Sequence, residues 1–365
     1  MGYGESALED LVTPSRAFWE GKRVLLTGHT GFKGGWLALW LERLGAKVFG
    51  LSLAPTTEFW ESIGSPAAIE AFGNIRDQVV LAQVIAEARP DVVLHLAAQA
   101  LVRPSYDNPA ETFDTNVMGL VRVLDACRNC ASVKAIVNVT SDKCYENREQ
   151  VWAYREAEPM GGSDPYSASK GCAELITSCY RQSYFSSSET ALLASARAGN
   201  VIGGGDWSVD RLVPDGVRAF AQSERVLIRN PLATRPWQHV LEPLSGYLVL
   251  AQALVEQGHD FADGWNFGPS DEDAWPVAKV VGRLADAWGG DAGWDHDARH
   301  HPKEAMLLRV DASKARALLK WRPRLRLEQA IDWSAEWYKA VLSGGDARTI
   351  TLQQIQAYEE LVALS

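Results

Sequence analysis

A glycine-rich turn near the N-terminus constrains the fold of this chain more than any other feature. Its glycines recur every third residue from Gly28 to Gly34. The apolar run 23–27 before the turn predicts a buried strand, the run 36–44 after it predicts a helix, and 47–51 predicts a second strand. A glycine turn inside such a βαβ unit is typical of a dinucleotide site, where a pyrophosphate meets the backbone N–H groups that begin the helix.

The same alternation continues as far as about residue 200. Further strands are predicted at 91–96, 135–139 and 192–196, separated by predicted helices at 82–88, 116–127 and 166–184. Strands that alternate with helices favour a parallel sheet with helices on both faces. We therefore predict an α/β fold with a Rossmann-type doubly wound parallel sheet and a smaller, mixed α/β C-terminal substrate lobe.

Glycines and prolines break the pattern in the second half of the chain, which indicates two parts. A dinucleotide-binding domain is expected over 18–200, with segments that return to it from about 235–265. A substrate-binding lobe is expected over 201–345, with a discontinuous boundary. Residues 1–17 and 349–365 are expected to be terminal extensions.

Composition excludes several functional classes. The chain carries 36 Lys and Arg against 46 Asp and Glu, and this net charge of −10 disfavours a nucleic-acid partner. No apolar run is long enough to span a membrane and no basic, apolar leader is visible, so we expect a cytoplasmic protein. An odd set of five cysteines fits a reducing compartment, and the lone pair Cys127 and Cys130 lacks the partners that zinc needs. We interpret His296, His300 and His301 as part of a solvated loop, and expect no metal.

Two short motifs carry candidate catalytic groups. Tyr166 and Lys170 are four residues apart, so a helix places them on one face. We expect the Lys170 ammonium to lower the pKa of the phenol, so that Tyr166 can take a proton from a hydroxyl while hydride leaves its carbon. Ser141, Asp142 and Lys143 follow a predicted strand, at the carboxyl edge of the sheet where ligands bind in such folds.

Together these motifs resemble the extended short-chain dehydrogenase/reductase superfamily. Within it the chain looks like the nucleotide-sugar 4,6-dehydratases, and most like the branch that acts on CDP-glucose. The resemblance covers about residues 18–340 and is most specific at 27–36, 140–145, 166–174, 199–207 and 235–240. Many dTDP-sugar dehydratases have Glu after the Asp, whereas Lys143 fits the CDP-glucose branch.

The resemblance implies an oxidation, a dehydration and a reduction of one sugar. Hydride passes from C4 to NAD⁺ with Tyr166 as base, Lys170 holding its pKa down and Ser141 hydrogen-bonding the developing ketone. The ketone makes the C5 proton acidic, and we expect Lys143 to assist its removal. Water then leaves as Asp142 protonates the C6 hydroxyl, and hydride returns to C6.

The resemblance also assigns binding residues. The implied contacts of NAD are Gly28, His29, Thr30, Gly31, Phe32, Lys33, Gly34, Ser52, Asn74, Ile75, Leu96, Ala97, Ala98, Gln99, Thr140, Tyr166 and Lys170. The implied contacts of the nucleotide sugar are Ser105, Asn200, Arg211, Leu212, Arg229, Arg235, Gln238, Asn266 and Glu304. The end of the second strand has neither an acidic residue for the ribose nor an arginine for a 2′-phosphate, so it leaves NAD and NADP open. Asn74 stands where the family usually has Asp.

Alternatives remain at the sequence level. An epimerase of the same superfamily needs only the Tyr166 and Lys170 pair, so Asp142 and Lys143 favour a dehydratase, of CDP-glucose or of another nucleotide sugar. A non-catalytic dinucleotide sensor would tend to lose one of the pair, and both are present. The resemblance further implies a homodimer or homotetramer, and a role in deoxysugar synthesis for a lipopolysaccharide O-antigen.

Overall fold

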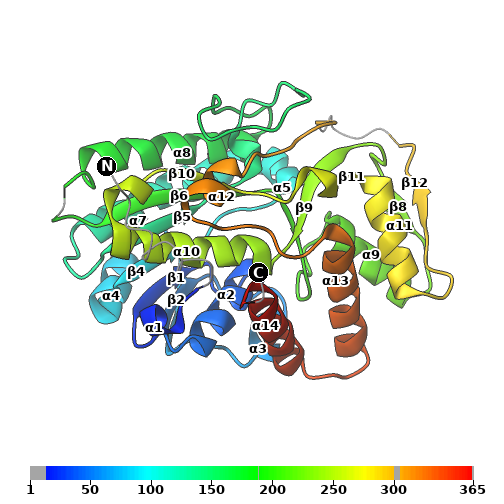
Figure 1. Ribbon diagram of the computed structural model, residues 1–365, viewed down its shortest axis with the longest axis horizontal. Helices are drawn as coiled ribbons and strands as arrows, with labels where there is room; N and C mark the ends of the chain where they lie inside the picture. The colour runs from blue at the N-terminus through cyan, green and yellow to red at the C-terminus, as the bar shows by residue number, and fades with distance from the viewer. Residues whose placement is uncertain (1–13, 188, 300–304, 364–365) are drawn as a thin grey trace.

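The computed structural model describes residues 14–187, 189–299 and 305–363. Its main sheet consists of β1 (Arg23–Thr27), β2 (Lys47–Ser52), β3 (Ile69–Phe72), β4 (Val92–His95), β5 (Ala135–Val139), β6 (Leu192–Ala198) and β10 (Gly264–Phe267). The strand order is β10-β6-β5-β4-β1-β2-β3, and every neighbouring pair is parallel (Figure 1). The chain runs outward from β1 to β3 and then crosses to β4 on the other side of β1, so the predicted doubly wound sheet is confirmed.

The two faces of the sheet have separate cores because successive strand residues point to opposite sides. On one face, Val24 and Leu26 of β1 belong to a core that includes the helices α2 (Phe32–Arg43) and α10 (Leu241–Gln257). On the other face, Leu25 belongs to a core that includes the helices α4 (Gln78–Ala88), α7 (Leu120–Arg128) and α8 (Pro165–Ser183). Strands covered on both faces explain the continuous apolar runs in the sequence.

Short elements complete this half of the molecule. They are α1 (Arg16–Trp19), α3 (Phe59–Ser62), α5 (Val102–Asp107), α6 (Pro109–Phe113) and α12 (Ser313–Leu318). A π-helical stretch, Asp114–Gly119, leads directly into α7, so the helix predicted over 116–127 begins in this wider turn. A short 3-10 turn, Asp142–Cys144, follows β5.

The smaller lobe combines two small sheets with three helices. The order β11-β9-β7 makes a mixed sheet, and β12 pairs with β8 in parallel. The strands are β7 (Asn200–Ile202), β8 (Val226–Ile228), β9 (Thr234–His239), β11 (Ala274–Pro276) and β12 (Trp294–His296), and the helices are α9 (Leu212–Ala221), α11 (Val277–Trp288) and α13 (Leu327–Leu342). Between β9 and β11 the chain returns to the main sheet as α10 and β10.

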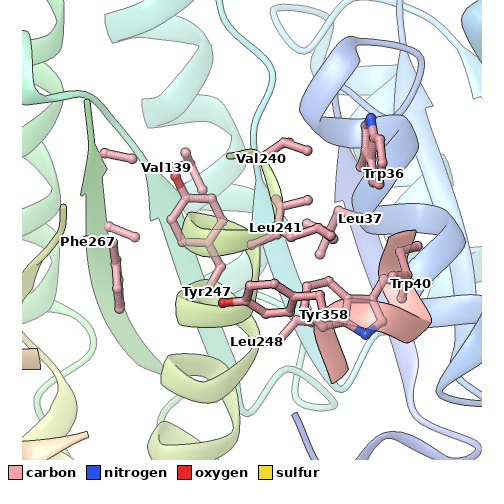
Figure 2. Packing of buried hydrophobic residues seen from close by; sticks show 14 of the residues in the cluster. Trp36, Leu37, Trp40, Val139, Val240, Leu241, Tyr247, Leu248, Phe267 and Tyr358 are labelled. Carbon is pink, nitrogen blue, oxygen red and sulfur yellow. The ribbon is translucent and has the colours of Figure 1, made fainter. Parts of the chain in front are cut away.

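The C-terminal helix α14 (Ala347–Ala363) packs against α2, although its sequence was expected to be a terminal extension. The rings of Trp40 and Tyr358 meet edge to face, with centroids 5.7 Å apart (Figure 2). The Trp40 indole also donates a 2.9 Å hydrogen bond to Glu359. The sequence reasoning missed this contact because its family motifs end before α14 begins.

No helix in the described part of the chain has both the length and the apolar character needed to cross a membrane. Over the same residues, no three His, Cys, Asp or Glu side chains gather in a way that could hold a metal ion. His296 is exposed, but it ends β12 and does not lie in the loop that the sequence predicted, because it pairs with Ile228 of β8, whereas His300 and His301 lie outside the described residues. All five cysteines are free thiols.

Candidate active site

A cavity of about 700 Å³ lies at the carboxyl edge of the main sheet and extends to the lobe. On the sheet side, the cavity is lined by the residues that directly follow β1, β4 and β5, namely Gly28, Leu96 and Thr140. Arg211 and Arg235 line it on the lobe side. The cavity therefore includes the point between β1 and β4 where the strand order reverses, which is where doubly wound folds bind dinucleotides.

The glycine turn is shaped for a phosphate group. Gly28 has φ +77°, and a Cβ there would lie 2.8 Å from the Ala97 nitrogen. A Cβ on Gly34 would lie 2.1 Å from the Gly28 carbonyl oxygen, so this position must also stay bare. A Cβ on Gly31 would meet only that carbonyl, at an ordinary 3.4 Å. Gly31 is the N-cap residue of α2 and no side chain caps this helix end, so the first N–H groups of α2 can receive a pyrophosphate.

The far end of the cavity suits an adenosine group. The hydroxyls of Thr30 and Ser52 are 2.7 Å apart and both residues line the cavity. Asn74 also lines it, and its side-chain oxygen accepts hydrogen bonds from the backbone and guanidinium of Arg76 at 2.9 and 3.1 Å. Arg76 is paired in turn with Asp114 at 2.8 Å. The residues of the turn and of this end thus fit a bound NAD.

Tyr166 and Lys170 both reach the cavity from the first turns of α8, which Asp164 caps. Burial raises the pKa of Tyr166 to about 12, although the hydroxyl of Ser141 hydrogen-bonds it and opposes the shift. Burial also lowers the pKa of the Lys170 ammonium to about 8. The expected lowering of the tyrosine pKa is therefore wrong for the protein alone, because desolvation of the phenolate outweighs the nearby positive charge.

The 3-10 turn after β5 places a buried carboxyl group, Asp142, at the same cavity. Asp142 is 2% exposed, and burial raises its pKa although Lys143, the Ser141 hydrogen bond and Arg235 act against the shift. Its Oδ1 accepts a 2.9 Å hydrogen bond from the Ser141 hydroxyl. Its Oδ2 is buried without a hydrogen-bond partner among the described residues. Such a carboxyl group is suited to give a proton to a ligand.

Positive side chains surround this acid. Lys33 reaches the cavity from α2, and burial together with Arg211 and Lys170 lowers its pKa to about 7. Arg211 forms a 2.8 Å ion pair with Asp206, and Arg235 donates a 2.9 Å hydrogen bond to the Thr234 carbonyl. Cations at this place suit the phosphates of a nucleotide.

The structure brings most of the predicted site residues together. Those that line the cavity are Gly28, Thr30, Gly31, Phe32, Lys33, Gly34, Ser52, Asn74, Ile75, Leu96, Ala97, Ala98, Thr140, Ser141, Asp142, Lys143, Tyr166, Lys170, Asn200, Arg211, Leu212, Arg229 and Arg235. Five others do not line it, namely His29, Gln99, Ser105, Gln238 and Asn266. Glu304 lies outside the described residues.

The five residues away from the lining have structural partners. The His29 ring packs edge-on against Trp60, with centroids 4.7 Å apart, and burial lowers its pKa to about 4. Ser105 accepts a 3.2 Å hydrogen bond from the Tyr166 backbone N–H. The remaining three bond to backbone carbonyls: Gln99 to Leu101, Gln238 to Phe267, and Asn266 to Tyr154 and Asp311.

Sequence reasoning missed several charged residues of the site. Asp206 lines the cavity and pairs with Arg211, and Asp210 lines it and pairs with Arg103 at 3.2 Å. Asp206 lies in the run 199–207, which carried the family resemblance but no assigned role. The sequence could have indicated Asp206 through this run, since an acidic residue within such a motif is a candidate partner for a nearby arginine.

Known proteins are similar to this chain in sequence and in fold. The family model described as GDP-mannose 4,6 dehydratase matches residues 25–333. A CDP-glucose 4,6-dehydratase of Salmonella typhimurium is 52% identical over 348 residues, which are 93% of this chain and 97% of that protein.

Solved structures share the fold at lower identity. A UDP-glucose 4-epimerase of Thermotoga maritima with UDP-glucose has a TM-score of 0.78 and 22% identity, over 87% of this chain and 99% of that chain. A dTDP-glucose 4,6-dehydratase of Bacillus anthracis in complex with NAD has a TM-score of 0.72 and 21% identity, over 87% of this chain and 96% of that chain. The family match and the 52% identity are what assign the family. The chain belongs to the nucleotide-sugar 4,6-dehydratases of the extended short-chain dehydrogenase/reductase superfamily.

Proposed function

We propose that this protein is an NAD-dependent CDP-glucose 4,6-dehydratase, a hydro-lyase that converts CDP-glucose to CDP-4-dehydro-6-deoxyglucose. The observation that carries the proposal is the 52% identity, over nearly the whole chain, to a protein of that activity. The cavity supports it, because it gathers a tyrosine, a lysine and a buried acid around one space.

The first task of the site is to oxidise the C4 alcohol of the sugar, which removes a hydride from C4 and a proton from its hydroxyl group. Bound NAD⁺ would supply the hydride acceptor for C4 and, once reduced, the hydride donor for C6. Tyr166 takes the hydroxyl proton, and Ser141, which already hydrogen-bonds Tyr166, also reaches the oxygen that becomes the ketone. Because burial alone favours the neutral phenol, the positive charges of Lys170 and of the bound cofactor are needed to favour the phenolate.

The second task is the loss of water across C5 and C6. Burial raises the pKa of Asp142 and so favours its protonated form, and this carboxyl group protonates the departing C6 hydroxyl. Lys143 lines the same cavity and assists removal of the C5 proton. The two neighbouring side chains thereby act as acid and base on adjacent carbons.

The lobe holds the nucleotide end of the substrate. Arg211 and Arg235 line the cavity opposite the glycine turn, where their planar guanidinium groups can each bind two phosphate oxygens. Asn200, Leu212 and Arg229 lie in the same wall.

The location, assembly and pathway follow from the same family. We propose a cytoplasmic enzyme, and a homodimer that joins copies through the π-helical stretch Asp114–Gly119 and the helices α7 and α8, or a homotetramer built from such dimers. Phe113, Met118 and Leu175 support this surface, since they are 37%, 44% and 61% exposed despite being large and apolar. The product is suited to deoxysugar synthesis for a lipopolysaccharide O-antigen.

A panel of nucleotide sugars tests the proposal. Purified protein with NAD⁺ is incubated separately with CDP-glucose, dTDP-glucose, UDP-glucose and GDP-mannose, and each product is analysed by mass spectrometry. We expect the loss of one water from CDP-glucose without net formation of NADH. Water loss from another sugar in preference to CDP-glucose would contradict the substrate, and a change of sugar configuration without water loss would favour an epimerase.

A further inference from the structure

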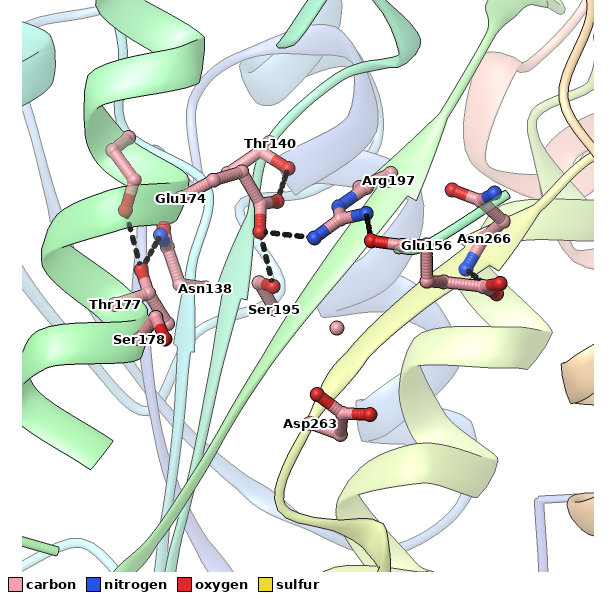
Figure 3. Close-up of polar contacts among 12 residues, drawn as sticks. Asn138, Thr140, Glu156, Glu174, Thr177, Ser178, Ser195, Arg197, Asp263 and Asn266 are labelled. Atoms are coloured by element: carbon pink, nitrogen blue, oxygen red, sulfur yellow. Dashed lines mark hydrogen bonds and ion pairs between the residues drawn. The ribbon is translucent and has the colours of Figure 1, made fainter. Parts of the chain in front are cut away.

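Behind the catalytic turn lies a buried polar network centred on Glu174 (Figure 3). One carboxylate oxygen of Glu174 accepts a short hydrogen bond from the hydroxyl of Thr140. The other accepts from the Ser195 hydroxyl and from the Arg197 guanidinium, both at 2.7 Å. The network thus joins α8, the end of β5 and the middle of β6 at one side chain.

The charge on Glu174 is firmly held. The side chains of Glu174 and Arg197 are only 3% and 6% exposed. Burial alone would raise the pKa of Glu174, but Arg197 and the hydrogen bonds from Thr140 and Ser195 hold it below its ordinary value. The carboxylate is therefore ionised at neutral pH, and all its contacts face the protein rather than the cavity.

This fixed negative charge lies one helical turn beyond Lys170 on α8. The Lys170 ammonium is 3.5 Å from the Val139 carbonyl, and Glu174 is the main charge that opposes the effect of burial on it. The other titratable groups that act on or beside Lys170 are Cys144 from the 3-10 turn, His95 from β4, Lys33 from α2, and Tyr166 from α8.

We propose that Glu174 is a positioning residue of the reaction, which keeps Lys170 in its charged form and holds Thr140, and with it the turn that bears Ser141 and Asp142, in place. Glu174 does not line the cavity, so it acts through these groups and not on the substrate. This inference rests on the proposed function, because it assigns a role within that reaction.

The network also extends to β10, the edge strand of the main sheet. Arg197 donates a 2.8 Å hydrogen bond to the Tyr145 hydroxyl, which donates one of 2.6 Å to Asn266. Asn266 in turn donates to the carbonyls of Tyr154 and Asp311, each at 3.0 Å. Arg197 therefore connects the catalytic turn to β10 and to the segment before α12, and its position depends on Glu174.

A neighbouring contact provides a matched control. Thr177 lies on α8 and donates to the Ala173 carbonyl, and it accepts a 2.8 Å hydrogen bond from Asn138 of β5. It joins the same helix to the same strand and is buried, but it carries no charge (Figure 3). Thr177→Val thus removes a comparable contact without changing the field at Lys170.

The test compares Glu174→Gln with Thr177→Val and the wild-type protein. The titration of Lys170 is followed by ¹³Cε NMR of labelled lysine, with Lys170→Arg to assign the signal, and turnover of CDP-glucose is followed across pH. In Glu174→Gln we expect the Lys170 titration and the basic limb of kcat to move down by at least about half a pH unit. We expect kcat to fall about tenfold with KM changed less than about twofold. In Thr177→Val, we expect the Lys170 titration and the basic limb of kcat to stay at their wild-type pH values.

An unchanged Lys170 titration in folded Glu174→Gln would overturn the proposal. So would a loss of kcat that is equal at every pH and matched by Thr177→Val, since that indicates a merely structural contact. If Glu174→Gln fails to fold, the double variant Glu174→Gln/Arg197→Met removes both charges of the pair, and the same titration decides. Wild-type protein that does not turn over CDP-glucose would refute the proposed function, while the NMR titration would still test Glu174.

Discussion

Two buried carboxyl groups near the end of β5 differ in the direction they face. Asp142 lines the cavity, its buried Oδ2 lacks a hydrogen-bond partner among the described residues, and burial raises its pKa. Glu174 faces the interior with both oxygens hydrogen-bonded, and its pKa is held low. The difference teaches that burial alone does not set the role of an acid here. A group that keeps its proton can transfer it to a ligand, whereas an ionised group with full partners acts through its charge and contacts.

The largest expected effect concerns the cavity side of this comparison. Tyr166→Phe removes the hydroxyl that exchanges a proton with the sugar, and we expect turnover of CDP-glucose to fall by about a thousandfold. Binding of NAD, measured by quenching of tryptophan fluorescence, should stay within about threefold of wild type, because the ring still fills its place. Turnover within tenfold of wild type would show that another group moves this proton.

The next prediction sets the two carboxyl groups against each other. The raised pKa of Asp142 means that its contribution to stability is present at low pH and is lost as pH rises through that pKa, so Asp142→Asn should gain stability over wild type with rising pH. The lowered pKa of Glu174 has the opposite sign, so its contribution is present above the ordinary carboxylate pKa and is lost as pH falls.

We therefore expect Glu174→Gln to lose about 3–5 kcal/mol at neutral pH, because Arg197 is left buried without its partner, and to lose less in acid. Urea unfolding of both variants and of the wild type between about pH 3 and about pH 9 measures this, because the Glu174 contribution is lost only below the ordinary pKa of a carboxyl group. Parallel pH dependences for the two variants would abolish the distinction between the groups.

A second pair of variants separates the acid from the base in the loss of water. Lys143→Met should stop exchange of the C5 hydrogen with deuterated water while CDP-glucose still binds. Asp142→Asn should retain that exchange and lower the release of water by about a hundredfold, since the leaving hydroxyl is no longer protonated. Proton NMR follows the exchange and mass spectrometry follows the water. Unchanged exchange in Lys143→Met would assign the C5 base to another residue.

The smallest expected effect extends the comparison to the glycine turn. Both glycines line the cavity, but a Cβ on Gly31 would lie 3.4 Å from the Gly28 carbonyl oxygen, whereas a Cβ on Gly34 would lie 2.1 Å from it. We expect Gly31→Ala to fold normally and bind NAD about tenfold more weakly, a difference of about 1.4 kcal/mol. Gly34→Ala should instead lower the unfolding midpoint, since its Cβ has no room. Equal NAD affinity of Gly31→Ala and wild type would mean that no phosphate approaches there.

Local sequence patterns predicted the sheet half of the site well. The glycine turn, the run Ser141 to Lys143 and the pair Tyr166 and Lys170 are each contiguous or one helical turn apart. Short-range spacing and the rule that parallel strands end at one edge are enough to bring them together. The same spacing could not predict the pKa of Tyr166, because desolvation depends on everything packed around the phenol.

The residues expected to bind the nucleotide sugar, in the lobe and on β10 of the main sheet, were harder to predict for the same reason. Arg211 and Arg235 line the cavity, but Gln238 and Asn266 bond to backbone carbonyls instead. Whether a strand side chain faces a ligand or a neighbouring segment depends on how distant parts of the chain pack. A register shift of one residue moves each side chain of the strand to the opposite face. Glu174 was overlooked although it ends the run that contains Tyr166, since its partner Arg197 is 23 residues away.

Transfer of a label within one sugar tests the proposed reaction most directly. CDP-[4-²H]glucose is mixed with an equal amount of CDP-[¹³C₆]glucose that carries no deuterium, and the products are analysed by NMR and mass spectrometry. We expect a product that has lost one water and carries deuterium at C6 of the ¹²C sugar only, because oxidation, dehydration and reduction occur in a single cavity. Deuterium that remains at C4 of a sugar with inverted configuration would contradict a dehydratase and assign the cavity to an epimerase.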